Sequence, residues 1–150
     1  MTRMSAKFLV DTNILVYAYD RSEPLKLARA QELLSWLEGA SAGALSTQIL
    51  GEFFNTATRK LSTPLPLARA LSCPVNYVRS WRTFDITPQI VLEAGRGSSE
   101  HQLSYWDAQI WATAKLNQIP VILSEDLGHR RPIDGVAFSN PFTGKIPGEE

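Results

Sequence analysis

The sequence predicts an α/β fold in which a parallel β-sheet is covered by helices on both sides. Short apolar runs alternate with segments of helical periodicity, which is the pattern of such sheets. Acidic residues stand where apolar runs end, and in open α/β sheets ligands collect beyond the carboxyl ends of the strands. The chain has 150 residues, 44% of them hydrophobic, which suffices for a core without disulfides or a structural metal. We expect a single domain over residues 1–150, with its core between residues 7 and 142.

The first strand is expected at residues 8–10, an apolar run that stops at Asp11. Apolar residues return at residues 14–19 and predict a short helix. A second helix is predicted over residues 24–39, because this segment starts with a proline, repeats leucine and alanine at helical spacing and ends with a glycine. The chain therefore begins with a strand, an acidic corner and two helices.

Residues 42–46 indicate a short buried strand. Thr47 is expected to cap the next helix, whose apolar residues form one face with Glu52 outside its middle. The stretch 61–74 contains three prolines. We therefore expect short helices separated by breaks here, forming a helical hairpin or arm.

Residues 82–87 are compatible with a strand, and Pro88 favours the start of another helix. The glycines and serines of residues 95–99 are expected to close that helix. Ser104 precedes a strongly helical segment that ends near Asn117. The strand–helix alternation of the first half thus continues.

Residues 120–123 predict a short, fully apolar strand, which Ser124 and two acids follow. Residues 135–138 predict a last weak strand. Residues 145–150 are expected to form a short, frayed and flexible tail.

Composition narrows the function classes. Fifteen Lys and Arg balance fifteen Asp and Glu, so a polynucleotide ligand would have to be attracted locally. Cys73 has no partner for a disulfide, and with His101 and His129 it provides no cluster for zinc. No apolar run approaches the roughly 18 residues of a membrane span, and the first residues lack the long apolar stretch of a secretory signal. We expect a soluble protein of the cytoplasm.

Asp107 is the most informative acidic residue. The helix predicted after Ser104 places it on the same side as Ile110 and Trp111, at offsets of 3 and 4 residues, so it should point inward. The alternative is a capping box with Ser104, in which the acid only serves the helix terminus. An inward carboxylate needs a cation or hydrogen-bond donors, or it takes up a proton.

Asp11 directly follows the first strand. Thr12 and Asn13 come next, and their short polar side chains can hold a turn and orient the carboxylate. Taken alone, Asp11 can equally be a helix cap.

Asp126 repeats this pattern after the strand at residues 120–123. Ser124 takes the orienting position, and Glu125 is an alternative to Asp126. Taken alone, a loop acid such as Asp126 is usually solvated. Glu52 is the weakest single candidate, because a glutamate on a helix is usually a surface residue.

The coincidence of the four acids carries more information than any one of them. Two end strands and two lie near the start of helices, so all four can meet at one edge of the sheet. Converging carboxylates raise one another's pKa unless a cation neutralises them. Oxygen ligands without Cys or His select Mg²⁺ or Mn²⁺, and such an ion is suited to phosphodiester hydrolysis by water.

The four acids belong to four motifs, which are Phe8-Leu9-Val10-Asp11-Thr12-Asn13-Ile14-Leu15, Ser46-Thr47-Gln48 with Glu52-Phe53, Ser104-Tyr105-Trp106-Asp107-Ala108, and Leu123-Ser124-Glu125-Asp126-Leu127. In order and spacing, these motifs resemble those of PIN-domain ribonucleases, and the end of the chain from Gly135 to Phe142 also resembles the end of that family. The resemblance runs from about Lys7 to Phe142, and it implies a three-layer α/β/α sandwich around a parallel sheet.

Among small single-domain members, the chain looks most like VapC toxins of type II toxin–antitoxin pairs. The resemblance implies Mg²⁺- or Mn²⁺-dependent endonucleolytic cleavage of RNA, a homodimer, and a VapB-type antitoxin that covers the active-site groove. A housekeeping RNA-processing nuclease and an inactive metal-binding scaffold stay open as alternatives. By similarity, Asp11, Glu52, Asp107 and Asp126 would bind the metal and catalyse, with Thr12, Asn13 and Ser124 as supporting polar residues.

Several other residues have open roles. His129 is expected to be a surface residue, and Arg130 and Arg131 either contact phosphates near the metal or are solvated. The same two alternatives apply to Arg59, Lys60, Arg79 and Arg82. Trp81 is a candidate for base stacking or a dimer contact, although aromatic residues in helical arms usually belong to the core.

Two other protein classes also place acids at strand ends. A haloacid-dehalogenase-type phosphatase needs a second Asp two residues after the first, where this chain has Asn13. A receiver domain needs paired acids after the first strand and a lysine after a late strand, and the segment 123–126 supplies no lysine. Both are therefore less consistent with the sequence than a nuclease.

Overall fold

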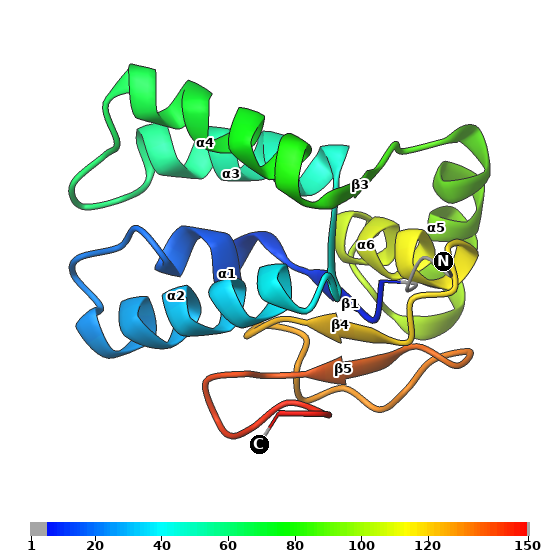
Figure 1. Cartoon of the computed structure of the whole chain (residues 1–150). Coiled ribbons are helices and arrows are strands. Elements are labelled where there is room, and N and C mark those ends of the chain that lie inside the picture. Colours follow the sequence, from blue (N-terminus) through cyan, green and yellow to red (C-terminus); the bar gives the residue numbers. More distant parts are fainter. Residues whose placement is uncertain (1–5, 150) are drawn as a thin grey trace.

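The computed structural model describes residues 6–149 and shows a parallel sheet with helices packed around it (Figure 1). None of the helices in that range is long and apolar enough to cross a membrane. The elements in chain order are β1 (Phe8–Val10), α1 (Thr12–Tyr17), α2 (Pro24–Gly39), β2 (Gly43–Ser46), α3 (Thr47–Arg59), α4 (Leu67–Ser80), β3 (Arg82–Phe84), α5 (Pro88–His101), α6 (Tyr105–Leu116), β4 (Val121–Leu123) and β5 (Ala137–Ser139).

The sheet has the strand order β3-β2-β1-β4-β5, and every neighbouring pair is parallel. Parallel strands are joined by right-handed crossovers, so α1 to α4 cover one face and α5 and α6 cover the other. In Figure 1, α5 and α6 accordingly lie together, apart from the other helices. The three-layer α/β/α sandwich predicted from the sequence is confirmed. The central strand of the sheet, β1, lies between β2 and β4. The residues that follow these three strands therefore lie close together.

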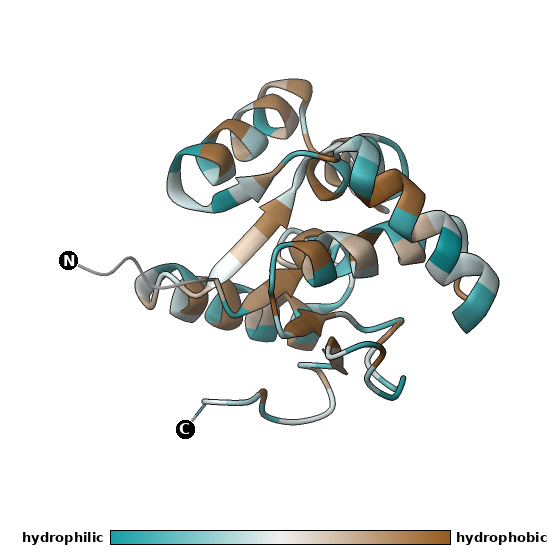
Figure 2. Cartoon of the chain, turned by 90° about the vertical axis from the view of Figure 1, so that its right-hand side faces the viewer, coloured by the Kyte–Doolittle hydropathy of each residue, from teal (hydrophilic) through white to brown (hydrophobic). Residues whose placement is uncertain are grey.

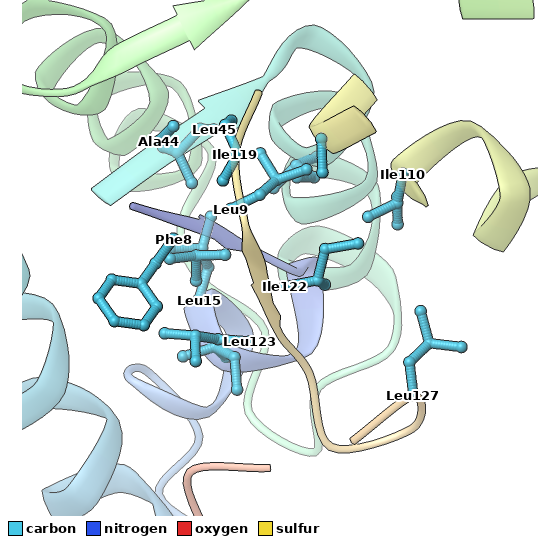
Figure 3. Packing of buried hydrophobic residues seen from close by; sticks show 14 of the residues in the cluster. Phe8, Leu9, Leu15, Ala44, Leu45, Ile110, Ile119, Ile122, Leu123 and Leu127 are labelled. Carbon is cyan, nitrogen blue, oxygen red and sulfur yellow. The ribbon is translucent and has the colours of Figure 1, made fainter. Parts of the chain in front are cut away.

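The core forms where the strands meet these helices. Leu9, Leu45 and Ile122 come from the three central strands and are completely buried, as strands covered on both faces require. Figure 3 shows these side chains packed together with Leu15 of α1 and Ile110 of α6. Figure 2 shows the same division by hydropathy, with apolar strands inside and hydrophilic residues on the outer faces of the helices.

The cap of α3 differs from the prediction. Ser46, not Thr47, is the N-cap, and its side chain accepts a hydrogen bond from the backbone N–H of Ile49 (3.2 Å). The reason is that β2 passes directly into α3, so the last extended residue of the strand is also the cap. The Thr47 hydroxyl instead accepts a hydrogen bond from the backbone N–H of Ile86 (3.3 Å).

The arm is also simpler than predicted. Helix α4 runs without a break through Pro74, so the expected short helices are wrong. A proline within a helix removes one backbone hydrogen bond, and packing has to offset that loss. Here Cys73 is buried against the core, and the ring of Tyr77 contacts Phe53 of α3 edge to face, with centroids 6.2 Å apart.

Helix α5 begins after Thr87, whose side chain caps it, so β3 is shorter than predicted. The helix also continues to His101, through the glycines and serines expected to end it. These small residues serve packing instead. A Cβ atom at Gly97 would lie 2.3 Å from the Trp111 ring, so the indole of α6 can approach α5 only over a glycine.

The end of the chain is anchored, contrary to the expectation of a frayed tail. Ile146 is 2% exposed, and the Glu149 carboxylate accepts hydrogen bonds from the Arg29 guanidinium at 2.6 and 2.8 Å. A bidentate pair of this kind holds a segment that has no regular structure of its own. Glu150, the last residue of the predicted tail, lies outside the described residues.

Candidate active site

The four acidic residues predicted from the sequence line one cleft of about 370 Å³ at the carboxyl edge of the sheet. Asp11 follows β1, Asp126 follows β4, Glu52 lies on α3 and Asp107 lies in the first turn of α6. Because β2 and β4 flank β1, the segments that leave these three strands start beside one another.

Asp11 is the most constrained of the four. It is only 6% exposed, and it caps α1 by accepting a hydrogen bond from the backbone N–H of Thr12 (2.7 Å). The Ser124 hydroxyl donates a second hydrogen bond to it (2.8 Å), and the Asn13 amide lies 3.3 Å from the same carboxylate oxygen. Its capping role and its place in the cleft are therefore compatible.

The electrostatics of Asp11 are unfavourable in the protein alone. Burial raises its pKa to about 6, although the hydrogen bonds from Ser124 and Thr12 act to lower the pKa. The charges of Glu52 and Asp107 raise the pKa further. An ionised Asp11 therefore needs positive charge nearby, or it binds a proton.

Asn13 joins the ends of β1 and β4. Its side-chain nitrogen lies 3.3 Å from the Ser124 hydroxyl and 3.4 Å from an Asp126 carboxylate oxygen, in addition to its contact with Asp11. Its side-chain oxygen accepts a hydrogen bond from the backbone N–H of Glu125 (3.2 Å). One amide thus fixes the position of Asp126 relative to Asp11.

Glu52 is held from two sides. One carboxylate oxygen lies 3.4 Å from the Thr12 hydroxyl, and the other accepts a hydrogen bond from the Gln48 amide (2.6 Å). The same Gln48 nitrogen donates to the backbone carbonyl of Trp106 (3.1 Å), while its oxygen accepts from Gln109 (2.9 Å). Gln48 therefore connects the carboxylate on α3 to the start of α6.

Glu125, the alternative to Asp126 in the sequence, also lines the cleft, but its carboxylate already has partners within the protein. The Lys26 ammonium lies 2.7 Å from one of its carboxylate oxygens, and the Tyr17 hydroxyl donates to the other (2.7 Å). Burial acts to raise the pKa of Glu125, but the hydrogen bonds from Lys26 and Tyr17 outweigh it and leave the pKa below its usual value. Its charge is already matched within the chain.

Two other groups of residues take no part in the cleft. His129, Arg130 and Arg131 are absent from its lining, and His129 is exposed. Trp81, a candidate for base stacking, is 7% exposed and donates a hydrogen bond to Glu38 (3.2 Å). It belongs to the core.

Two residues of the site, Gln48 and Trp106, were not singled out from the sequence, and Lys60 was open between a phosphate contact and a solvated residue. Gln48 supports Glu52, and Lys60 and Trp106 line the cleft. A signal for two of them exists, because Gln48, Glu52, Thr56 and Lys60 repeat every fourth residue and so share one side of α3. Trp106 directly precedes Asp107.

The donor set is suited to a hard cation. Within residues 6–149, no three Asp, Glu, His or Cys side chains are arranged closely enough to enclose an ion. A closed cage is not required, because Mg²⁺ usually keeps several waters and takes one or two carboxylates together with substrate phosphate oxygens. Oxygen ligands at an open cleft meet that description, and Asp11 has no ion-pair partner in the described part of the chain.

Comparison with solved structures shows the same fold in toxin–antitoxin proteins. The chain superposes on a chain of a DNA-bound VapBC from Salmonella typhimurium with a TM-score of 0.66 and 18% identity, covering 91% of this chain and 98% of that one. For a toxin–antitoxin complex from Klebsiella pneumoniae the TM-score is 0.65 at 21% identity, with 95% and 100% covered. For Mycobacterium tuberculosis VapC20, described as a sarcin-ricin loop cleaving toxin, it is 0.59 at 18% identity, with 77% and 86% covered.

The comparison of sequences assigns the family. No curated protein matches the chain significantly. The family model of the PIN domain matches residues 8–133. That match includes the four acids predicted from the sequence and every element from β1 to β4. The protein is a member of the PIN-domain family.

Proposed function

We propose that this protein is a divalent-metal-dependent endoribonuclease, and that it is the toxin of a VapBC-type toxin–antitoxin pair. One observation carries the proposal: four carboxylates from four separate segments line one cleft, where burial and neighbouring acids raise the pKa of Asp11. A bound cation would stabilise the ionised form of Asp11 in such a site. At a nucleic-acid backbone, the reaction that such a cation supports is hydrolysis.

The residues take the following roles. Asp11 and Asp107 hold the principal ion, Asp126 binds it directly or through water, and Glu52 orients the attacking water or helps to hold a second ion. When bound, Mg²⁺ or Mn²⁺ lowers the pKa of the attacking water and offsets charge on the scissile phosphate. Thr12, Asn13 and Ser124 keep the carboxylates in place through the hydrogen bonds described above.

The partner is a small VapB-type antitoxin that covers the cleft, and the protein itself forms a homodimer. Support for the antitoxin comes from the solved structures of similar fold, which include VapBC complexes and FitAB bound to DNA. A short reading frame for a DNA-binding protein directly upstream of the gene would agree with this assignment. Growth arrest on expression, relieved by co-expression of that reading frame, would distinguish a toxin from a housekeeping nuclease.

The test of the activity is incubation with end-labelled total RNA, with Mg²⁺, with Mn²⁺ and with EDTA. We expect discrete fragments with either ion and none with EDTA. Asp107→Asn should produce no fragments, and circular dichroism should show that this variant is folded. Absence of cleavage with every ion would mean an inactive scaffold, and an Asp107→Asn variant that cuts at the parental rate would contradict the assigned site.

A further inference from the structure

Trp106 stands out at the mouth of the cleft. It lines the cleft next to Asp107, yet its side chain is 63% exposed. A single exposed aromatic residue is common on protein surfaces, so exposure alone indicates nothing. The position of this one indicates more, because its ring lines the same cleft as the four carboxylates.

The Trp106 residue is held in place by contacts with neighbouring residues. It packs edge to face on Tyr105, with centroids 5.1 Å apart and an angle of 75° between the planes. The Tyr105 hydroxyl donates a hydrogen bond to Gln109 (2.8 Å), which is itself buried. The Trp106 carbonyl accepts the hydrogen bond from Gln48 that also fixes Glu52. The indole is therefore a supported flat surface at a fixed position relative to the carboxylates.

Lys60 lies along the same cleft. It is the C-cap residue of α3 and follows Glu52 by eight residues, which corresponds to about 12 Å along the helix axis. Of the described residues that line the cleft, it alone carries a positive charge, and within residues 6–149 it has no ion-pair partner. The ammonium of Lys60 is therefore available to bind a phosphate of the ligand. This phosphate would be a different one from the reacting phosphate at the carboxylates.

We propose that Trp106 is a stacking platform for an unpaired base and that Lys60 binds a phosphate of the same strand. The ligand is then a single-stranded stretch of RNA that crosses the cleft along α3, with its scissile phosphate at the carboxylates. This inference rests on the function proposed above. It adds that the site selects an unpaired stretch of the RNA substrate. A stacked base needs no particular sequence and must be unpaired, so the protein prefers loops over duplexes.

The test for Trp106 uses intrinsic tryptophan fluorescence. Wild-type protein is titrated with a short single-stranded RNA in Ca²⁺, a hard cation that occupies oxygen sites, and gels verify that the RNA stays intact. Stacking should quench part of the emission in a saturable way, and Trp106→Phe should lose this quenching while still binding. Trp36→Phe, which removes another partly exposed tryptophan, should keep the quenching. Quenching that persists in Trp106→Phe would overturn the proposal.

Affinity provides the second measurement. In fluorescence anisotropy with labelled RNA, Trp106→Ala should bind roughly tenfold more weakly, the scale of one stacked base, and Trp106→Phe should recover most of the loss. A duplex of the same sequence should bind more weakly than the single strand. Trp106→Ala that binds and cleaves RNA like wild type, but loses a co-purifying protein partner, would assign the ring to a protein interface instead.

The salt dependence of binding tests Lys60. Loss of one phosphate contact to a single strand should lower the slope of log affinity against log salt by about 0.7. We expect this for Lys60→Gln and recovery for Lys60→Arg. Arg59→Gln is the matched control, because Arg59 is the adjacent exposed cation and does not line the cleft. Equal slopes for Lys60→Gln and Arg59→Gln would remove Lys60 from the site.

The two proposals fail separately. RNA that binds with Trp106-dependent quenching but is not cut with any ion would reject the nuclease and keep the platform. Metal-dependent cleavage that Trp106→Ala leaves unchanged would reject the platform and keep the nuclease. Wild-type protein that binds no single-stranded RNA would reject the platform directly.

Discussion

Two groups of acidic residues in this molecule have opposite environments. Between α5, α6 and the segment before β5, Glu93 and Asp134 both contact Arg96, and Lys115 lies 3.1 Å and 3.2 Å from the same two acids. Hydrogen bonds from Arg96, the largest contribution, hold the pKa values of Glu93 and Asp134 below their usual range. In the cleft, burial raises the pKa of Asp11. The acids between α5 and α6 are thus paired with cations of their own chain, as Glu125 is in the lining of the cleft, whereas Asp11 has no ion-pair partner within residues 6–149.

The largest expected effect is on activity. Asp11→Asn should reduce RNA cleavage more than about 100-fold, because even residues that only support metal ligands change activity by about 10–100-fold. Asp134→Asn should leave kcat/KM within about twofold, since Asp134 lies away from the cleft and Asn tolerates its left-handed backbone (φ 48°). Both variants are measured on one labelled RNA. Equal losses would mean that the two groups of acids do not differ in function.

The same pair of variants should have opposite effects on stability. In EDTA, at a pH well above 6, Asp11→Asn should raise the thermal midpoint, because it removes a charge that burial and neighbouring acids disfavour. Asp134→Asn should lower the midpoint, because Arg96 and Lys115 lose a partner. Mg²⁺ at about 100 times its Kd should stabilise wild-type protein by about 2.7 kcal/mol, and Asp11→Asn much less. Differential scanning fluorimetry measures both effects, and a fall in the midpoint of Asp11→Asn would contradict the comparison.

Gln48 tests whether the cleft depends on its support. Gln48→Met keeps the size of the side chain but removes the hydrogen bonds to Glu52 and Trp106. We expect kcat to fall by about 10–100-fold, as for the loss of a partner that orients a metal ligand. Gln48→Glu should be at least as damaging, because it adds an acid beside Glu52. A change confined to KM would assign Gln48 to substrate binding rather than to the position of Glu52.

Glu125 can be changed from an acid with a paired cation into one without by a single substitution at Lys26. Lys26→Met removes the counter-charge of Glu125, so the thermal midpoint of the metal-free protein should fall. Adding Glu125→Gln should restore most of the loss, because the unmatched charge is then gone. The double-mutant cycle in EDTA gives the coupling between the two side chains. Losses that simply add would show that Lys26 acts through its packing on Tyr17 instead.

The smallest effect concerns pH. The pKa of Glu149 is lowered to about 2, chiefly by its hydrogen bonds with Arg29. A folded-state pKa below the unfolded value of about 4.3 contributes stability above that value, and the contribution disappears as the pH falls towards 2. Wild type should therefore exceed Glu149→Gln in unfolding free energy by a constant amount above about pH 5, with the difference vanishing near pH 2. Urea titrations at a series of pH values measure it. A difference that does not depend on pH would exclude the ion pair as its source.

The fold and the placement of the four acids could be predicted because they depend on local sequence. An apolar run followed by Asp11 or Asp126 marks the end of a strand, and Thr87 and Ser104 are caps with a direct local signal. The strand order was not predictable in this way. It determines that the acid after β1 lies between the segments that follow β2 and β4.

The errors involve contacts between distant segments. Nothing around Glu125 indicates that Lys26, almost one hundred positions earlier, would neutralise it. The same holds for Glu149, which pairs with Arg29, and for the unbroken helix through Pro74, which relies on packing against α3. The role of Trp81 could not be decided from the sequence for a related reason. Its burial depends on the approach of Gly43, where a Cβ atom would lie 2.1 Å from the indole.

The absence of a side chain at Gly97 has a consequence for the proposed active site. Trp111 rests on this glycine and lies one turn after Asp107 on α6. A single added methyl group on α5 would push against the indole, and α6 would have to shift with it. The first turn of α6, which carries Asp107, would then move as well. A substitution that touches no residue of the cleft would in this way change the position of one of its carboxylates.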